Sequence, residues 1–73
     1  MYTINFKISN PDAARFGIHE HSDALGVGPF ETSDLAIKAI REIRDNPASA
    51  GFAEWLGFAW LWVCDGGGNV VWC

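Results

Sequence analysis

The chain has 73 residues, a net charge of −4 at pH 7 and 49% hydrophobic residues, with four tryptophans and two cysteines. This length allows a single domain, residues 1–73, and excludes multidomain enzymes, doubly wound nucleotide-binding folds and solenoids of three or more repeats. The apolar content excludes intrinsic disorder. A pI near 4.8 argues against nucleic-acid binding through a basic patch, and two cysteines are too few for a disulfide scaffold.

The longest apolar run and the cysteines bear on location. Residues 1–9 lack the basic region and apolar stretch of a signal peptide. The longest uncharged apolar run, residues 55–64, is ten residues long, whereas a membrane span needs about 20. We therefore expect a cytoplasmic protein without a membrane segment, in which Cys64 and Cys73 are free thiols. Neither plausible register of the C-terminal hairpin brings these two cysteines within disulfide distance.

The first predicted element is a strand over residues 2–9, where apolar and polar side chains alternate without interruption. Its apolar side chains should face the core, and its polar ones, including Asn5 and Lys7, should face away. Asn10 suits the N-cap and Pro11 the first position of one helical turn over residues 11–16. Residues 18–30 are rich in glycine and polar side chains, which predicts a loop.

The next element is an amphipathic helix over residues 32–45, capped by Thr32 or Ser33 and ended by the Asn-Pro pair at 46–47. Its charged side chains occupy one side of the helical wheel and its apolar side chains the other. The apolar arc consists of Leu35, Ala36, Ala39, Ile40 and Ile43. We expect this arc to lie on a sheet.

The remaining elements complete an α+β fold of order β-α-β-β. Residues 58–64 and 69–73 are β-rich and flank an Asp-Gly-Gly-Gly turn, which predicts a C-terminal hairpin. Residues 48–57 fit either a short helical turn or an irregular connection. The predicted architecture is a three-stranded, mostly antiparallel sheet with helix 32–45 on one face. If the first strand pairs in parallel with its neighbour, the crossover should be right-handed.

The predicted hairpin is apolar on both faces, unlike the first strand. When Cys64 lies opposite Val70, one face carries Phe58, Trp60, Trp62, Val70 and Trp72. In the alternative register, Trp72 crosses to the face of Leu61. A single helix covers only one face of a sheet, so residues 10–30, a second copy of the chain or a partner must cover the other.

Charge is distributed unevenly along the chain. Residues 1–45 hold all five basic residues and seven of the nine acidic ones, whereas residues 46–73 hold all four tryptophans and only Glu54 and Asp65 as charged side chains. An aromatic-rich, charge-poor segment is typical of an interface core, where tryptophan is often a hot spot. The competing interpretation is a small core enlarged with aromatic side chains beneath a folded-over loop.

Three motifs with potential chemistry are weak, so we predict no enzymatic activity, no cofactor and no metal. His19, His21 and Asp23 could approach a divalent ion, but no further strong ligand lies nearby in sequence. The Gly-Val-Gly segment at 26–28 lacks the third glycine of a phosphate-binding loop. Cys64 lies in an apolar strand, which blunts its reactivity as a nucleophile.

The tryptophans also offer surfaces for stacking. Nucleic-acid bases could stack on Trp60, Trp62 or Trp72, but the chain lacks the positive groove that supplies most of the affinity, so direct nucleic-acid binding is not expected. Sugars need no basic patch, and a small sugar- or metal-binding domain using the tryptophans and residues 19–23 stays as an alternative.

The C-terminal part carries a resemblance to a known group of proteins. Residues 32–73, which end in the segment WVCDGGGNVVW over residues 62–72, resemble small phage-encoded α+β proteins, among them anti-CRISPR inhibitors with one helix on a short antiparallel sheet and a terminal hairpin. No catalytic or binding motif accompanies the resemblance. It implies a non-enzymatic protein that occludes a surface of a larger nucleoprotein complex.

The leading hypothesis is a protein-binding protein, a phage inhibitor of a host defence nucleoprotein complex. Its expected contact residues are Trp55, Trp60, Trp62 and Trp72, with Asn5 and Lys7 at the rim. The acidic residues Glu20, Asp23 and Glu31 should meet a basic, nucleic-acid-binding surface of the partner. The second hypothesis is a structural homodimer that packs through its tryptophan-rich sheet faces.

Overall fold

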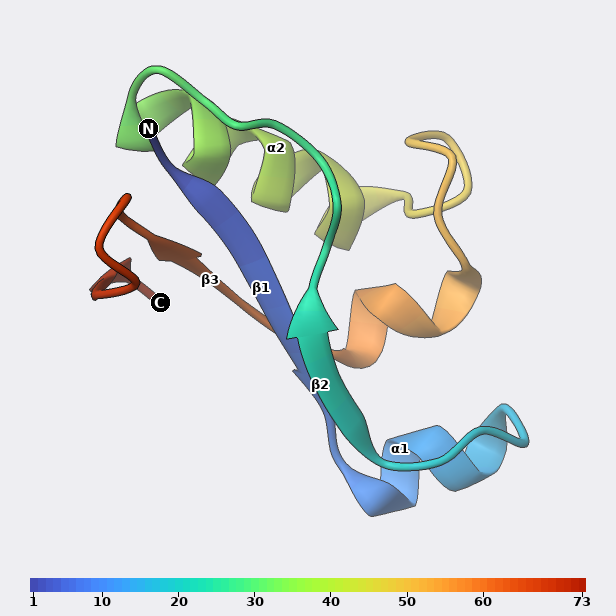
Figure 1. Ribbon diagram of the computed structural model, residues 1–73. Coiled ribbons are helices and arrows are strands. Elements are labelled where there is room, and N and C mark those ends of the chain that lie inside the picture. The colour runs from blue at the N-terminus through green and yellow to red at the C-terminus, as the bar shows by residue number, and fades with distance from the viewer.

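The computed structural model describes residues 1–73 and contains four strands, two α-helices and one 3-10 helix (Figure 1). In chain order these elements are β1 (Thr3–Ile8), α1 (Asn10–Arg15), β2 (His21–Ala24), α2 (Ser33–Asp45), the 3-10 helix η1 (Glu54–Phe58), β3 (Trp60–Cys64) and β4 (Val70–Trp72). The α+β class is confirmed.

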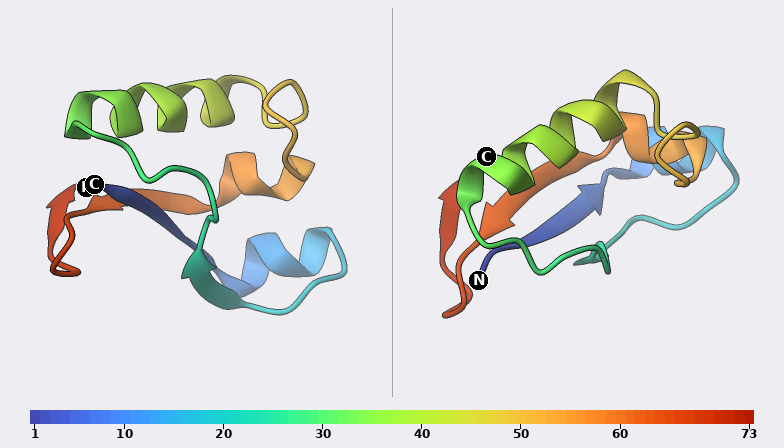
Figure 2. Two further views of the ribbon diagram at one scale, coloured as in Figure 1. Left: turned by 45° about the horizontal axis from the view of Figure 1, so that its top comes forward. Right: turned by 90° about the horizontal axis from the view of Figure 1, so that it is seen from above.

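The strands form one antiparallel sheet in the order β2-β1-β3-β4. Helices α2 and η1 contact each other and lie on the same side of this sheet (Figure 2). The sheet has four strands rather than the three predicted. Because β1 pairs antiparallel with both of its neighbours, the condition for a right-handed parallel crossover is not met.

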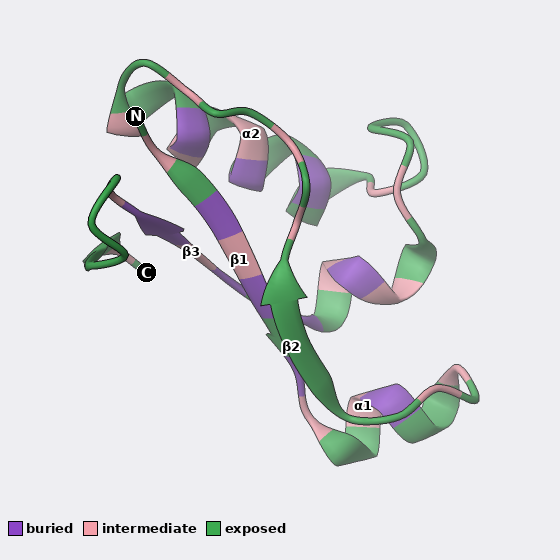
Figure 3. Cartoon of the chain, viewed as in Figure 1, coloured by how far each residue is buried: buried purple, intermediate pink, exposed green.

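Strand β2 lies inside residues 18–30, where the sequence predicts a loop, and that prediction is wrong for these four residues. All four residues are exposed (Figure 3). Because neither side of the strand is buried, its sequence shows no alternation of apolar and polar side chains. Main-chain pairing holds the segment instead: β2 pairs with β1, the Leu25 amide donates to the Ile4 carbonyl at 2.9 Å, and Tyr2 exchanges two 2.8 Å hydrogen bonds with Phe30. Residues 18–30 therefore extend the sheet sideways.

The core lies between the sheet and the helices. Ile4, Phe6 and Ile8 of β1 are buried, as their alternation predicts. Across from them α2 buries Ala36, Ile40 and Ile43, whereas Leu35, which the pattern places in the same apolar arc, is 49% exposed. Leu56, Ala59, Leu61 and Val63 complete the cluster, together with Ala13.

Helix α2 has a side-chain cap at its N-terminus, whereas α1 begins without one. Helix α2 begins after Thr32, whose Oγ1 accepts a hydrogen bond from the Leu35 amide at 3.3 Å, and it ends before Asn46, which confirms the prediction. Helix α1 begins one residue earlier than predicted, so that Ser9 rather than Asn10 is its N-cap. None of the helices is both long and apolar enough to cross a lipid bilayer.

The C-terminal hairpin contains an irregularity that neither predicted register includes. Cys64 lies opposite Val70, as in the first register, but Val63 lies opposite Trp72, so β4 carries one additional residue between these pairs. This bulge moves the Trp72 side chain to the face of Val63, where it packs against the core. Both strands are shorter than predicted: residue 58 belongs to η1, and β4 spans residues 70–72.

Candidate functional site

The candidate site is the face of the sheet directed away from α2. Lys7 lies opposite Trp60, Asn5 opposite Trp62, and Thr3 opposite Cys64, so these side chains share the face that the core residues do not use. Ser22 and Ala24 continue this face on β2, and Val70 continues it on β4. We call this set the open face: Thr3, Asn5, Lys7, Ser22, Ala24, Trp60, Trp62, Cys64 and Val70.

Trp60 is the most exposed large hydrophobic side chain of the open face, with 69% of its surface accessible. Trp62, two residues along β3, is half-buried, and Lys7 is exposed. Directly opposed residues in an antiparallel pair have Cβ atoms about 5 Å apart, so the Lys7 stem and the Trp60 indole are immediate neighbours. The middle of the open face therefore presents an accessible aromatic surface beside one positive charge.

One hydrogen bond within the open face joins β1 to β3. The Asn5 side-chain amide donates from Nδ2 to Sγ of Cys64 at 3.2 Å. Cys64 is buried and Cys73 exposed, and both are free cysteines. Asn5 is thus engaged by its neighbour strand, and the Cys64 thiol is shielded rather than presented.

Trp55 and Trp72, predicted as contact residues, do not belong to the open face. Trp55 lies in η1 on the core side, where its ring centroid is 5.5 Å from that of Phe6 and 5.6 Å from that of His21. Trp72 is on the core side because of the β4 bulge. The predicted patch of tryptophans is therefore divided between two faces, and only Trp60 and Trp62 stay together.

The three predicted acidic contacts also lie outside the open face. Glu20 accepts a hydrogen bond from the Asn10 amide at 2.9 Å, in the first turn of α1. Asp23 lies opposite Phe6, on the core side of β2, and its carboxylate accepts from the Ala24 amide at 2.7 Å. Glu31 is exposed in the segment before α2. Two of these carboxylates therefore serve local main-chain groups.

The open face also contains residues that the sequence does not single out. Ser22 and Ala24 join it through β2, and Val70 is 58% exposed at its other side. No sequence signal marks Ser22 and Ala24, because their strand lacks apolar alternation. Phe58, predicted to share the tryptophan face, ends η1 and packs at a tilt against Phe16, with ring centroids 5.5 Å apart.

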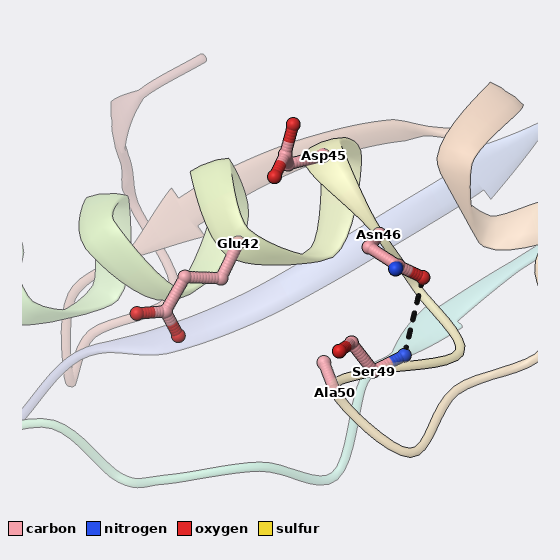
Figure 4. A pocket seen from close by; sticks show the side chains of 5 residues that line it. All are labelled: Glu42, Asp45, Asn46, Ser49 and Ala50. Atoms are coloured by element: carbon pink, nitrogen blue, oxygen red, sulfur yellow. Dashed lines mark hydrogen bonds between the residues drawn. The ribbon is translucent and has the colours of Figure 1, made fainter.

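A second feature is a depression of about 300 Å³ at the C-terminal end of α2 (Figure 4). Glu42, Asp45 and Asn46 line it, together with Ser49 and Ala50. The Ser49 amide donates to the Asn46 side chain at 3.2 Å, while the two carboxylates point in different directions (Figure 4). These acidic side chains do not converge on one point.

The histidine cluster considered in the sequence does not assemble into a ligand set. No three His, Cys, Asp or Glu side chains of the chain group in a way that could hold a metal ion. The His21 ring packs edge-on against Phe6 at 5.3 Å, and its Nδ1 is 2.7 Å from the His19 carbonyl oxygen. His21 thus covers the core at the sheet margin.

The chain was compared with protein-family models, curated proteins and solved structures, and none of them matches it. The chemistry of the open face therefore rests on its own side chains. These offer two neighbouring indoles, one ammonium group, and a margin of hydroxyl and amide groups.

Proposed function

We propose that the chain is a non-enzymatic protein-binding protein that uses the open face to occlude a surface of its partner. The observation that carries this proposal is Trp60, whose indole is 69% exposed beside Trp62 while the aliphatic core is complete on the opposite face. An exposed indole in a charge-poor patch is the side chain most often found at the centre of a protein interface.

The partner surface that fits the open face is apolar and carries a carboxylate. Trp60 and Trp62 offer flat apolar area, and Lys7 beside them offers the positive charge for an acidic group. Thr3 and Ser22 supply hydroxyl groups able to bond polar groups or water, and Asn5, whose Nδ2 bonds to Cys64, offers its side-chain oxygen. The charged contact at the open face thus comes from Lys7, whereas the sequence-based hypothesis assigns the charged contacts to acidic residues of the chain.

A host defence nucleoprotein complex is our proposal for the identity of the partner, and it rests on the resemblance of residues 32–73 to phage inhibitors. Its support in the chain is the net charge of −4, which favours encounter with a basic surface. Glu31 and the carboxylates beside α2 would act in that encounter at a distance, since the open face itself is not acidic. A cytoplasmic location belongs to the same proposal.

The proposal is tested by affinity capture from the native host with the wild type, Trp60→Ala and Leu35→Ala. Leu35 is the matched control because it is exposed and apolar but lies on α2. We expect Trp60→Ala to lower recovery of a specific protein by roughly tenfold or more, as for a hot-spot residue, and Leu35→Ala to leave it unchanged. Equal recovery with all three chains contradicts the proposal.

Sedimentation of the purified chain over micromolar concentrations separates partner binding from self-association. A monomer throughout agrees with the proposal and excludes a homodimer through the open face. A dimer that Trp60→Ala dissociates contradicts it and supports the homodimer. Acrylamide quenching adds an independent check, because an accessible Trp60 in the monomer requires that at least one indole is quenched.

A further inference from the structure

The edge of the sheet beside β3 is incomplete. Strand β4 pairs only with Val63 and Cys64, through Trp72 and Val70. The first three residues of β3, 60–62, pair with β1 on one side and have no strand on the other. A free main-chain edge of this kind can accept an additional strand.

The hydrogen-bonding direction along β3 identifies the residue at this edge. The Asp65 amide donates to the Asn69 carbonyl at 2.9 Å, towards the β4 side. Main-chain groups alternate in direction along a strand, so Val63 and Leu61 point to the same side. The pairing of β1 is consistent with this direction. The Ile4 carbonyl accepts from Leu25, towards β2, so the main-chain groups of Thr3 and Asn5 point towards β3 and bond there to Cys64 and Trp62.

The free edge is the floor of a groove of about 300 Å³. Its lining residues are Arg44, Trp60, Leu61, Trp62 and Cys73. Leu61 is only 2% exposed, so its outward main-chain groups lie beneath the side chains that line this groove, and an occupant reaches them by displacing those side chains. The groove thus brings two indoles and a guanidinium together beside the unpaired edge of β3.

Arg44 gives the groove a positive charge, and this charge indicates which kind of segment the groove would bind. The residues three and four positions away from it on either side are Ile40, Arg41, Pro47 and Ala48. None of them is acidic, so α2 offers Arg44 no partner at helical spacing. A carboxylate entering the groove would be the complementary group.

The opposite edge of the sheet is partly blocked by one of its own side chains. On β2 the outward-directed amides are those of Ser22 and Ala24, because the alternate residues bond to β1. Asp23 occupies the Ala24 amide with its own carboxylate at 2.7 Å. This is a typical way to protect an edge strand, and it leaves the β3 edge as the better site for strand addition.

We propose that the β3 edge binds an extended, acidic segment of the partner protein, which adds a short strand beside Leu61. The segment exchanges main-chain hydrogen bonds with Leu61, places a carboxylate against Arg44, and packs an apolar side chain on Trp60 and Trp62. This proposal rests on the proposed function, because it names how the same partner uses two of the same tryptophans. A second copy of the chain fits less well, since pairing of two β3 edges would bring two Arg44 side chains into one interface.

The test uses NMR titration of the ¹⁵N-labelled chain with two capped peptides, Thr-Val-Glu-Val-Thr and Thr-Val-Lys-Val-Thr, at millimolar concentration. We expect the Glu peptide to shift the Leu61 amide and to bind roughly threefold or more tighter than the Lys peptide, as for one partly exposed ion pair. Arg44→Ala should abolish this difference. No shift at Leu61 with either peptide, or equal binding of both to the wild type, overturns the proposal.

A main-chain variant separates edge pairing from binding on the open face. Replacement of the Leu61 amide by an ester, in a chain assembled from two synthetic segments joined at Cys64, removes the outward N–H and keeps the side chain. The matched control is the same replacement at Ser22 on the other edge. We expect only the Leu61 ester to lose Glu-peptide binding. If both esters bind alike while Trp60→Ala still lowers partner capture, the edge proposal fails and the proposed function stands.

Discussion

The two faces of the sheet are built from the same strands but differ in burial: one carries the core, and the other carries an exposed indole. On β3, Leu61 and Val63 are essentially buried, whereas Trp60, the first residue of the strand, is 69% exposed. None of the four tryptophans is among the fully buried side chains; the core consists of aliphatic residues, one phenylalanine and small side chains. The comparison indicates that the core does not need the tryptophans of the open face, and β2 extends the sheet rather than crossing that face.

The strongest test of this comparison is removal of a core side chain. Ile40 of α2 is fully buried, so we expect Ile40→Ala to lower the free energy of unfolding by about 2–5 kcal/mol. Leu35→Ala on the same helix should cost well under half as much, because its side chain is 49% exposed. Denaturant unfolding followed by circular dichroism measures both. Similar losses for the two variants would contradict the assignment of the core face.

A sharper test compares Trp72 with Trp60, which lie on opposite faces of the sheet because of the β4 bulge. Trp72 packs partly buried against the core, so we expect Trp72→Ala to lower the free energy of unfolding by about 2 kcal/mol. Trp60→Ala should change it by no more than about 0.5 kcal/mol, as for a surface residue. The same unfolding experiment serves here. Equal destabilisation would place both indoles on one face, as in the first predicted register.

The elements predicted correctly from the sequence are those in which the spacing of apolar side chains indicates the buried face. Residues 2–9 alternate and contain β1, which spans Thr3–Ile8; residues 32–45 carry a helical arc and contain α2, which spans Ser33–Asp45. Strand β2 has no such period, since the pairing of its main chain with β1 determines its position. A four-residue exposed strand is invisible to hydrophobic patterning.

The candidate site was predictable to the same extent. Asn5, Lys7, Trp60 and Trp62 share a face because strict alternation extends through both β1 and β3. Trp72 was predictable only in part: the alternative register places it on the face of Leu61, where the structure has it, but the additional residue in β4 that puts it there belongs to neither register. Trp55 precedes the strand in a 3-10 helix, where no period-2 argument applies. The bulge in β4 and the 3-10 helix η1 therefore determine that only Trp60 and Trp62 share a face.

A smaller effect is expected from the hydrogen bond within the open face. Asn5→Ala removes the donor to the Cys64 sulfur, and we expect a loss of roughly 0.5–1 kcal/mol in the free energy of unfolding. Lys7→Ala, on the same face of the same strand, is the control and should cost less. Asn5→Ala should also speed alkylation of the Cys64 thiol in the native chain. An unchanged alkylation rate would mean that Asn5 does not shield the sulfur.

The smallest predicted effect concerns the turn that joins the two strands of the hairpin. Hydrogen bonds from the Asn69 amide at 3.0 Å and the Gly67 amide at 2.9 Å hold the pKa of the Asp65 carboxyl below its ordinary value of 3.8. A lowered pKa in the folded chain means that the ionised carboxylate stabilises the turn. This stabilisation is therefore complete above the ordinary pKa and is lost as the pH falls below it.

The measurement is an NMR titration of the Gly67 and Asn69 amides from about pH 5 to about pH 2. Both amides should shift together as Asp65 is protonated. In Asp65→Asn the side-chain oxygen can still accept hydrogen bonds, but it carries no titrating charge, so the shifts should stay flat. Glu54→Gln removes the other carboxylate of residues 46–73 and should leave the wild-type titration intact. Because Asp65 lies in the turn and outside the open face, the indoles of Trp60 and Trp62 should be unaffected by this transition.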